Sequence, residues 1–262
     1  MRVISLNANG IRSAARKGLF DWLPQQNADF LCLQEIKAQL SDLEGDVTFS
    51  PAGWHAHFNH AQKKGYAGVG IFSRREPDHV LDKLGVAEFD DEGRYLELRY
   101  GALSVVSLYV PSGSSGPDRQ ASKDRFLAFF LPVLRDWLAS GRQYIVVGDW
   151  NIAHKNIDLK NWRGNQKNSG FLPHERAWMD QLLGTEAPGL GWVDAYRQLH
   201  PATEGEAYTW WSNRGQAWAK NVGWRIDYQI VTPNLRDKIR TTSIWKDTRF
   251  SDHAPLTIDY AL

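Results

Sequence analysis

The chain has 262 residues, of which 42% are hydrophobic, with one cysteine and a formal net charge of +1 from 31 basic and 30 acidic residues. This length excludes a minimal, poorly packed fold, and we expect one domain spanning residues 1–262, because no linker-like stretch or repeat divides the chain. The balanced charge excludes a strongly basic nucleic-acid-binding composition, and the lone cysteine excludes a disulfide scaffold.

The first segment, residues 2–6, predicts a strand. It has neither the charged start nor the long apolar centre of a signal peptide, and no apolar run approaches the length of a membrane span. Cys32 lies inside an apolar run and is expected to be a small core residue. These features favour a cytoplasmic protein without membrane segments.

Three apolar runs end in polar, oxygen-bearing residues. Residues 2–6 are followed by Asn7, the run that begins at Asp29 is followed by Glu35, and the run that begins at Tyr144 ends at Asp149. Asn151 follows two residues later, so strand alternation would point it the same way as Asp149. Open α/β sheets bind ligands at the carboxyl ends of their strands, so a common site is predicted there. The alternative is a set of unrelated turn caps.

Further strand patterns cover residues 55–58, 68–72, 95–98 and 103–109. Their alternation of apolar and polar residues predicts a mostly antiparallel or mixed sheet. Tyr109 ends the last of these strands. Its phenol is expected either in the core, as a buried polar group, or facing the site.

Apolar residues recur at helical spacing from Asp118 to Leu138, which predicts a helix packed on the core. Pro132 predicts a kink there or a division into two shorter helices. The polar stretch 153–170 has little periodicity, and loops of this length in compact domains are usually functional or disordered. Pro173 is expected to open a short helix.

Residues 155–225 combine basic residues with many of the 12 tryptophans. Such interleaving suits phosphate contacts and base stacking, or a solvated basic face over core tryptophans. A strand is predicted over Asp227–Val231, and a closing strand follows Asp252 and His253. The pair at 252–253 adjoins a strand start, which favours a place in the site.

Six motifs in fixed order resemble the exonuclease III family of apurinic/apyrimidinic endonucleases, within the endonuclease/exonuclease/phosphatase group. They are Asn7, Gln34–Glu35, Tyr109, Gly148–Asn151, Trp224–Tyr228 and Ser251–His253. The resemblance spans essentially the whole chain and is closest to bacterial repair enzymes. It implies an α/β fold in which a two-sheet β-sandwich is flanked by helices, giving four layers.

The resemblance also implies a magnesium-dependent DNA phosphodiesterase of base excision repair. The implied metal ligands are Asn7, Glu35, Asp149, Asn151 and Asp252. The implied catalytic residues are Tyr109, Asp149, Asn151, Asp227 and His253. The implied contacts to DNA and to the abasic pocket are Arg12, Lys37, Trp210, Trp224 and Ile226.

Carboxylate and amide oxygens are the ligands that Mg²⁺ prefers, and we expect Mn²⁺ to substitute for it. The expected partner is double-stranded DNA with abasic sites or blocked 3′ ends. We expect a monomer in the cytoplasm, associated with the nucleoid through DNA. Two alternatives are a non-catalytic nucleic-acid-binding regulator of the same fold and a phosphodiesterase acting on non-DNA substrates.

Overall fold

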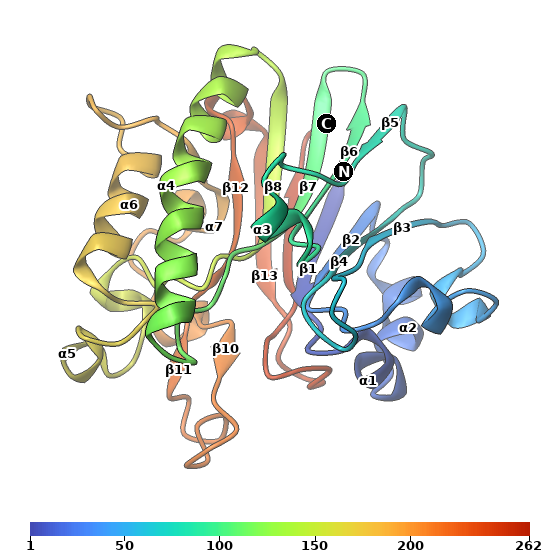
Figure 1. Cartoon of the computed structure of the whole chain (residues 1–262), viewed down its shortest axis with the longest axis horizontal. Helices are drawn as coiled ribbons and strands as arrows, with labels where there is room; N and C mark the ends of the chain where they lie inside the picture. The colour runs from blue at the N-terminus through green and yellow to red at the C-terminus, as the bar shows by residue number, and fades with distance from the viewer.

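The computed structural model describes all residues, 1–262. Two six-stranded sheets face each other, and Figure 1 shows them between groups of helices. The first sheet has the order β13 (Ile239–Ile244), β14 (Leu256–Tyr260), β1 (Arg2–Asn7), β2 (Phe30–Gln34), β4 (Val69–Ser73), β3 (His55–Asn59). The second has the order β5 (His79–Leu81), β6 (Tyr95–Tyr100), β7 (Leu103–Tyr109), β8 (Gln143–Asp149), β12 (Asp227–Val231), β9 (Val193–Asp194).

Each sheet contains one parallel pair of neighbouring strands at its centre. β1 pairs parallel with β2, β7 pairs parallel with β8, and all other pairings in both sheets are antiparallel. The prediction of a mixed sheet is therefore confirmed. A separate two-stranded ribbon is formed by β10 (Trp210–Trp211) and β11 (Gly223–Trp224).

Side-chain alternation along the strands builds three cores. Val3 points between the sheets while its neighbour Ile4 points outward, and Val147 and Val146 divide in the same way. The inner core joins both sheets, and the two outer cores join each sheet to helices. Burial on both faces explains why β2, β4 and β8 read as continuous apolar runs.

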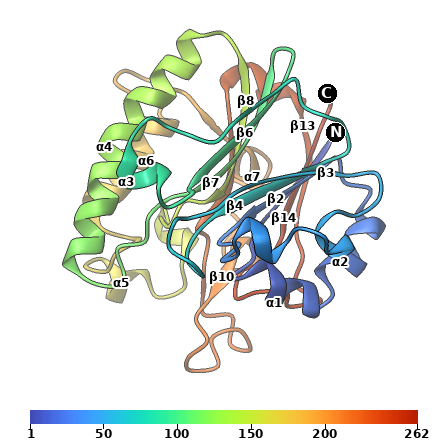
Figure 2. The ribbon, with the colours of Figure 1, turned by 45° about the vertical axis from the view of Figure 1, so that its right-hand side comes forward.

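The helices cover the two outer faces. α4 (Pro117–Ala139), α6 (Pro173–Leu183) and the short α3 (Ala87–Asp90) pack on the second sheet, whereas α1 (Ile11–Arg16) and α2 (Leu19–Trp22) pack on the first. Figure 2 shows these helices on opposite sides of the paired sheets. The four-layer α/β sandwich predicted from the sequence is confirmed. The remaining short helices are α5 (Trp162–Asn165) and α7 (Ala195–Leu199).

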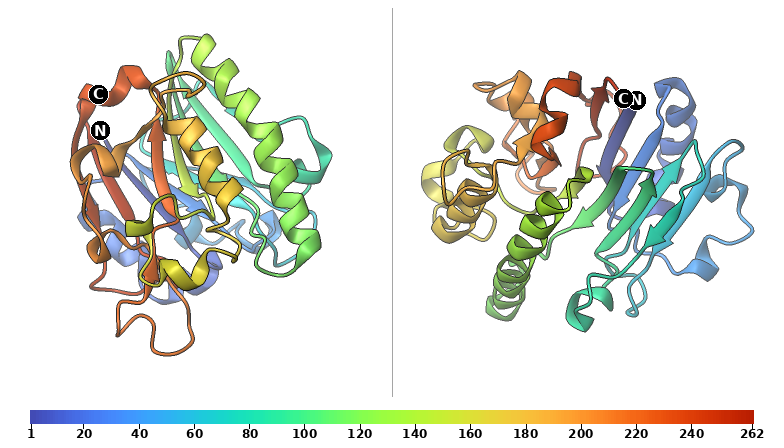
Figure 3. Two further views of the ribbon diagram at one scale, coloured as in Figure 1. Left: turned by 90° about the vertical axis from the view of Figure 1, so that its left-hand side faces the viewer. Right: turned by 90° about the horizontal axis from the view of Figure 1, so that it is seen from above.

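Six 3₁₀ turns lie in the connections: η1 (Leu23–Gln26), η2 (Leu40–Asp42), η3 (Val47–Phe49), η4 (Asn156–Asp158), η5 (Gly205–Ala207) and η6 (Pro233–Lys238). The two ends of the chain meet, since the amino group of Met1 donates to the Tyr260 carbonyl at 2.7 Å. Figure 3 shows both termini at one end of the sandwich. None of the helices combines the length and apolar composition that a membrane crossing requires.

Of the two outcomes predicted at Pro132, a kink or a division into two shorter helices, the division is excluded, because α4 runs unbroken through this residue. Proline removes one hydrogen bond and disfavours the preceding helical turn. The apolar face of α4, with Phe126, Phe130 and Leu134 fully buried, supplies packing that outweighs this local cost.

Candidate active site

The carboxyl ends of the central parallel strands meet at one edge of the sandwich. The register pairs Asn7 with Gln34 across β1 and β2, and Asp149 with Tyr109 across β7 and β8. On the other side of β8, Asp149 lies opposite Asp227 at the start of β12. Both sheets therefore deliver polar side chains to the same edge.

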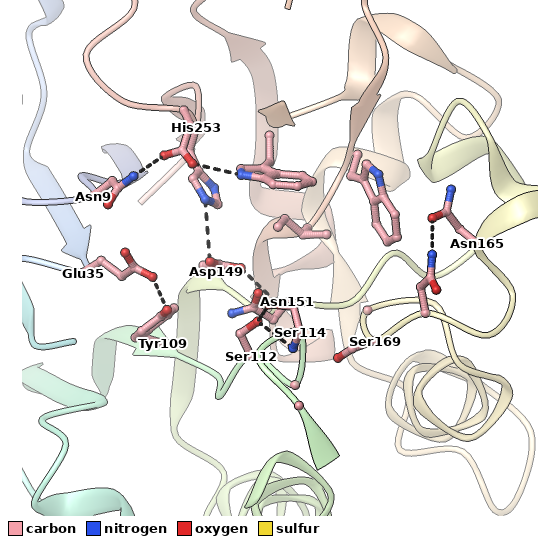
Figure 4. A pocket seen from close by; sticks show the side chains of 18 of the residues that line it. Asn9, Glu35, Tyr109, Ser112, Ser114, Asp149, Asn151, Asn165, Ser169 and His253 are labelled. Carbon is pink, nitrogen blue, oxygen red and sulfur yellow. Dashed lines mark hydrogen bonds and ion pairs between the residues drawn. The ribbon is translucent and has the colours of Figure 1, made fainter. Parts of the chain in front are cut away.

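A cavity of about 660 Å³ opens at this edge, and Figure 4 shows the side chains that point into it. Ten of the predicted site residues line it: Glu35, Lys37, Tyr109, Asp149, Asn151, Trp210, Trp224, Ile226, Asp252 and His253. Asn7 and Asp227 lie directly behind it, since each hydrogen bonds to a lining residue. Arg12 lines a different hollow with Arg16 and Asp42, and its role at DNA stays a prediction.

Asp149 is held by two amides. Its Oδ2 accepts from Asn7 Nδ2 at 2.9 Å, and its Oδ1 accepts from the Asn151 backbone amide at 2.8 Å. Burial raises the pKa of Asp149 to about 7; the Asp227 carboxylate acts in the same direction, and His253 opposes the shift. A carboxylate with a pKa near neutrality is suited to accept a proton.

His253 lies next to Asp149 and is held in place by Asp227. Its Nδ1 bonds Asp227 Oδ2 at 2.9 Å, and its Nε2 lies 3.9 Å from Asp149 Oδ2. Burial works against the charged imidazolium, but Asp227 and then Asp149 outweigh it and raise the pKa of His253 to about 10. The raised pKa favours the protonated imidazolium, in which the Nε2–H lies on the side of Asp149.

Glu35 and Asp252 face the cavity from the first sheet and from the segment before β14. Glu35 accepts from the Tyr109 hydroxyl, and its other oxygen lies 2.9 Å from the Lys37 ammonium. Asp252 accepts from Asn9 Nδ2 at 2.9 Å. Burial opposes ionisation of Asp252, but His253 and hydrogen bonds from Asn9, Trp210 and Ser251 lower its pKa, so the group stays anionic.

The donor chemistry at this edge fits a hard divalent cation. Glu35 and Asp252 supply oxygen atoms only, which suit Mg²⁺ better than a softer metal. The nearby group of Asp149, Asp227 and His253, with ligand atoms within 4.8 Å of one another, includes an imidazole already bonded to a carboxylate. Asn7 donates to Asp149 and its Oδ1 accepts from the Asn9 amide, so its predicted role as a ligand stays a prediction.

Several non-glycine residues of the site adopt left-handed backbone conformations. Glu35 has φ 47°, Lys37 has φ 50° and Asn151 has φ 52°. Such conformations cost free energy for residues with a Cβ and persist where the surroundings enforce them, often at functional sites. For Asn151, the turn departs from the strand alternation expected from the sequence, yet its side chain still reaches the cavity.

One wall of the cavity is aromatic. Trp210 and Trp224 face each other across the β10–β11 ribbon with their rings at 79° and 6.2 Å between centroids, and Ile226 packs beneath them. Both indoles are only partly buried, whereas Trp211 has 1% of its surface exposed and belongs to a core cluster. Of the Trp210–Trp211 pair, Trp210 therefore faces the site.

A test of this wall compares Trp224 with Trp211. Because one face of the Trp224 ring borders the cavity, Trp224→Ala is expected to leave the protein folded and to reduce the preference for abasic over intact DNA. Trp211→Ala, which empties a core position, is expected to cost ~3–5 kcal/mol of stability with the preference unchanged. Thermal unfolding of each variant, measured beside its incision of abasic and of intact duplex DNA, distinguishes the two roles. A large stability loss with unchanged preference in Trp224→Ala would contradict the assignment.

Sequence reasoning missed several residues of the site. Asn9 donates to Asp252 and accepts from Lys37 Nζ at 2.6 Å, and Lys37 in turn lies 2.9 Å from Glu35, so Asn9 connects Asp252 to Glu35 through Lys37. Further polar side chains complete the lining: Ser112 and Ser114 from the loop after β7, and Asn165, Lys167, Asn168 and Ser169 from the end of α5 and the loop that follows it. The loop-rich composition of 111–116 and 165–170 signals turns, but nothing in the sequence shows that both turn toward Asp149.

A buried ion cluster supports the aromatic wall from behind. Asp158 accepts from Arg225 Nε at 2.7 Å and from Arg197 Nη2 at 2.5 Å, and neither Asp158 nor Arg225 is more than 1% exposed. Burial alone would raise the pKa of Asp158, but the two guanidinium groups hold it well below its usual range. Arg225 is therefore an internal anchor between Trp224 and Ile226 rather than part of a solvated basic face.

Comparison with known proteins agrees with this geometry. Residues 4–253 match the endonuclease/exonuclease/phosphatase family. An exodeoxyribonuclease of Bacillus subtilis (strain 168) is 39% identical over 259 residues, covering 98% of both chains. A DNA-(apurinic or apyrimidinic site) endonuclease of Dictyostelium discoideum is 35% identical over 98% of this chain and 70% of its own length.

Among solved structures, an AP endonuclease from Archaeoglobus fulgidus superposes with a TM-score of 0.88 at 27% identity, with both chains fully covered. The fold of this chain thus has a counterpart over its whole length. The chain belongs to the endonuclease/exonuclease/phosphatase family, and within it resembles the exonuclease III-type enzymes that its motifs indicated.

Proposed function

We propose that this protein is a Mg²⁺-dependent DNA phosphodiesterase of base excision repair that cleaves the backbone 5′ to abasic sites. We include 3′-end cleaning and 3′→5′ exonuclease action on duplex DNA in the proposal. The main supporting observation is that four ionisable side chains converge beside an aromatic pocket. They are Asp149, suited to act as a general base, the imidazole of His253, and the carboxylates of Glu35 and Asp252. Relatives named as an exodeoxyribonuclease and an AP endonuclease support the DNA substrate.

Asp149 is suited to take the proton of the attacking water. Asn7 and the Asn151 amide hold its two oxygens, so a water bound to it would be presented in one direction. As the water oxygen bonds to phosphorus, its proton passes to Asp149 and the bond from phosphorus to the upstream O3′ breaks. The departing O3′ takes up a proton from solvent, so the products are a 3′-hydroxyl and a 5′-phosphate on the abasic sugar.

His253 and Asn151 would neutralise and orient the phosphoryl oxygens. The Nε2–H of the His253 imidazolium is directed to the same space as Asp149, and Asp227 fixes its tautomer. The side-chain Nδ2 of Asn151 donates a hydrogen bond to the Val110 carbonyl at 2.9 Å, which holds the carboxamide in place. Burial and the adjacent Glu35 raise the pKa of Tyr109, so its phenol stays protonated and able to donate on the leaving-group side.

Glu35 and Asp252, with Asn7, Asp149 and Asn151 as further candidates, would hold the metal. A bound Mg²⁺ supplies Lewis-acid polarisation of the phosphate and stabilises charge on the departing oxygen. The oxygen-only donor set supports Mg²⁺ over softer metals and is compatible with Mn²⁺. Lys37, adjacent to Glu35, would contact a phosphate of the bound strand.

Replacing Glu35 by Ala is expected to weaken Mg²⁺ binding and to raise the metal concentration needed for half-maximal incision. The reason is the loss of one of the two carboxylates, Glu35 and Asp252, that are the first candidates for holding the metal. Titration of incision with Mg²⁺ measures the shift, and Glu44→Ala, an exposed carboxylate away from the cavity, is the control. Normal cleavage by Glu35→Ala at limiting Mg²⁺ would show that the ligand assignment is wrong.

Specificity for an abasic nucleotide follows from the size and chemistry of the wall. A sugar without its base can turn into a compact apolar recess, whereas an intact nucleotide is larger and costs more to unstack. Trp210, Trp224 and Ile226 form such a recess next to Asp149.

The proposed function is tested on a panel of substrates with Mg²⁺ and with EDTA. We expect cleavage of a labelled duplex with a single abasic analogue, slower loss of undamaged 3′ ends, and no release of phosphate from inositol or lipid phosphates. Binding of DNA without cleavage would favour a regulator, and preferred hydrolysis of the non-DNA phosphates would favour the other alternative. For a DNA enzyme of bacterial type, we further propose the cytoplasm and its nucleoid as the location.

A further inference from the structure

A completely buried ion pair joins α4 and α6 behind the loop that follows β8, residues 150–172. Lys123 on α4 and Glu175 on α6 are both 0% exposed, and Lys123 Nζ lies 2.6 Å from Glu175 Oε1. Neither side chain reaches the cavity, and the mechanism above uses neither. Burying two charges is costly, and an apolar pair of similar volume would often stabilise a fold as well. This pair therefore calls for a role other than stability.

Each member of the pair holds a backbone group of the loop that follows β8. Lys123 Nζ donates to the Asn151 carbonyl at 2.7 Å, and no backbone amide donates to that oxygen. Glu175 Oε2 accepts from the amides of Gly170 at 2.7 Å and Leu172 at 3.0 Å. Lys123 thus holds the start of the 150–172 loop by hydrogen bonding, and Glu175 holds its end.

The backbone groups that the pair holds, at Asn151 and Gly170, lie next to Asp149 and Trp224 of the site. The backbone amide of Asn151 donates to Asp149 at 2.8 Å, and Asn151 itself adopts a left-handed backbone conformation with φ 52°. Gly170 sits at φ 90° against the Trp224 ring, where an added Cβ would meet Trp224 at 3.3 Å and the Asn151 carbonyl at 3.1 Å. The Ala153 amide donates to the Gly170 carbonyl at 2.7 Å and closes the segment on itself.

We propose that Lys123 and Glu175 are positioning residues that fix the Asn151 turn and Gly170, and so align Asn151 with Asp149 and set the Trp224 wall. This inference rests on the proposed function. The pair acts through the backbone and touches no reacting atom. Without these hydrogen bonds, the Asn151 turn can change its conformation. A misplacement of about 1 Å at a catalytic group can cost as much as ~10²-fold in rate.

The test compares Lys123→Met, the double variant Lys123→Met with Glu175→Gln, and Arg125→Met. The single change strands a buried carboxylate and is expected to lower Tm by roughly 10 °C. The double change removes both charges, keeps an acceptor for the Gly170 amide and is expected to recover most of that Tm. Arg125, on the same helix, forms an exposed pair with Glu88 and has no contact with the loop, so it is the matched control.

For abasic DNA, the double variant is expected to show kcat lowered ~10-fold or more with KM within about threefold of wild type. Arg125→Met should match the wild type in both constants. Hydrogen exchange followed by mass spectrometry should show faster exchange in peptides from 150–172 of the double variant, with other core peptides unchanged. All rates are taken per folded molecule, at temperatures well below each Tm.

A double variant that keeps the wild-type kcat per folded molecule, or that changes KM alone, overturns the inference, because the pair then serves stability or binding only. Unchanged exchange in 150–172 also overturns it. If the wild-type protein fails to cut abasic DNA, the proposed function fails, and the exchange experiment still decides whether the pair positions the loop.

Discussion

Asp149→Asn is expected to lower DNA incision by at least ~10²-fold, the scale associated with losing general acid–base help, while DNA binding persists. The substitution keeps the shape of the side chain and removes the charge that burial and neighbouring groups tune for proton transfer. Single-turnover incision and a binding titration with the same abasic duplex measure the two effects separately.

Asp21→Asn, an exposed carboxylate on α2, is the control for the chemical change alone and should behave as wild type. If Asp149→Asn lost folding and DNA binding together, Asp149 would be a structural aspartate. If it kept the wild-type rate, another group would act on the water.

Asp158→Ala is expected to destabilise the protein by ~3–5 kcal/mol, the usual cost of breaking a buried ion pair from one side. The change leaves the Arg225 and Arg197 guanidiniums without the carboxylate that both now contact. Chemical denaturation gives the free energy of unfolding. Glu206→Ala, which removes an exposed carboxylate 3.5 Å from Lys246, should cost less than ~1 kcal/mol.

The same carboxylate predicts the direction of acid sensitivity. The pKa of Asp158 is lower in the folded protein than in the unfolded chain, so its contribution is complete above the usual Asp range near pH ~4. That contribution is lost as the pH falls through the depressed folded-state pKa. The wild type should therefore lose stability on acidification more steeply than Asp158→Ala, and equal slopes would contradict the assignment.

The central strands and the site edge could be predicted because their signals are local. An apolar run that stops at Gly148 and Asp149 indicates a buried strand end, and the strand Asp227–Val231 has the predicted bounds. Edge and ribbon strands gave no such signal. β13 is rich in Thr and Ser with an exposed face, and β9, β10 and β11 have two residues each, too few for a period.

The supporting shell could not be predicted because its partners are distant in the chain. Lys123 and Arg225 read in the sequence as ordinary charged positions, yet both are buried against carboxylates of other elements. Only the packing of α4 on α6, and of the 153–170 segment on β11, brings them together. Residue type therefore indicated the groups that face substrate, and the fold was needed to find those that hold them.

The most direct test of the central claim is to map the bond that is cut. A 5′-labelled duplex with one abasic analogue is incubated with the protein in Mg²⁺, and the product is sized against a ladder and tested for extension by a polymerase. The account predicts a single early product that ends in a 3′-hydroxyl immediately upstream of the lesion, absent in EDTA and nearly absent with Asp149→Asn. A product that retains the abasic sugar at its 3′ end, or equal cleavage in EDTA, would contradict it.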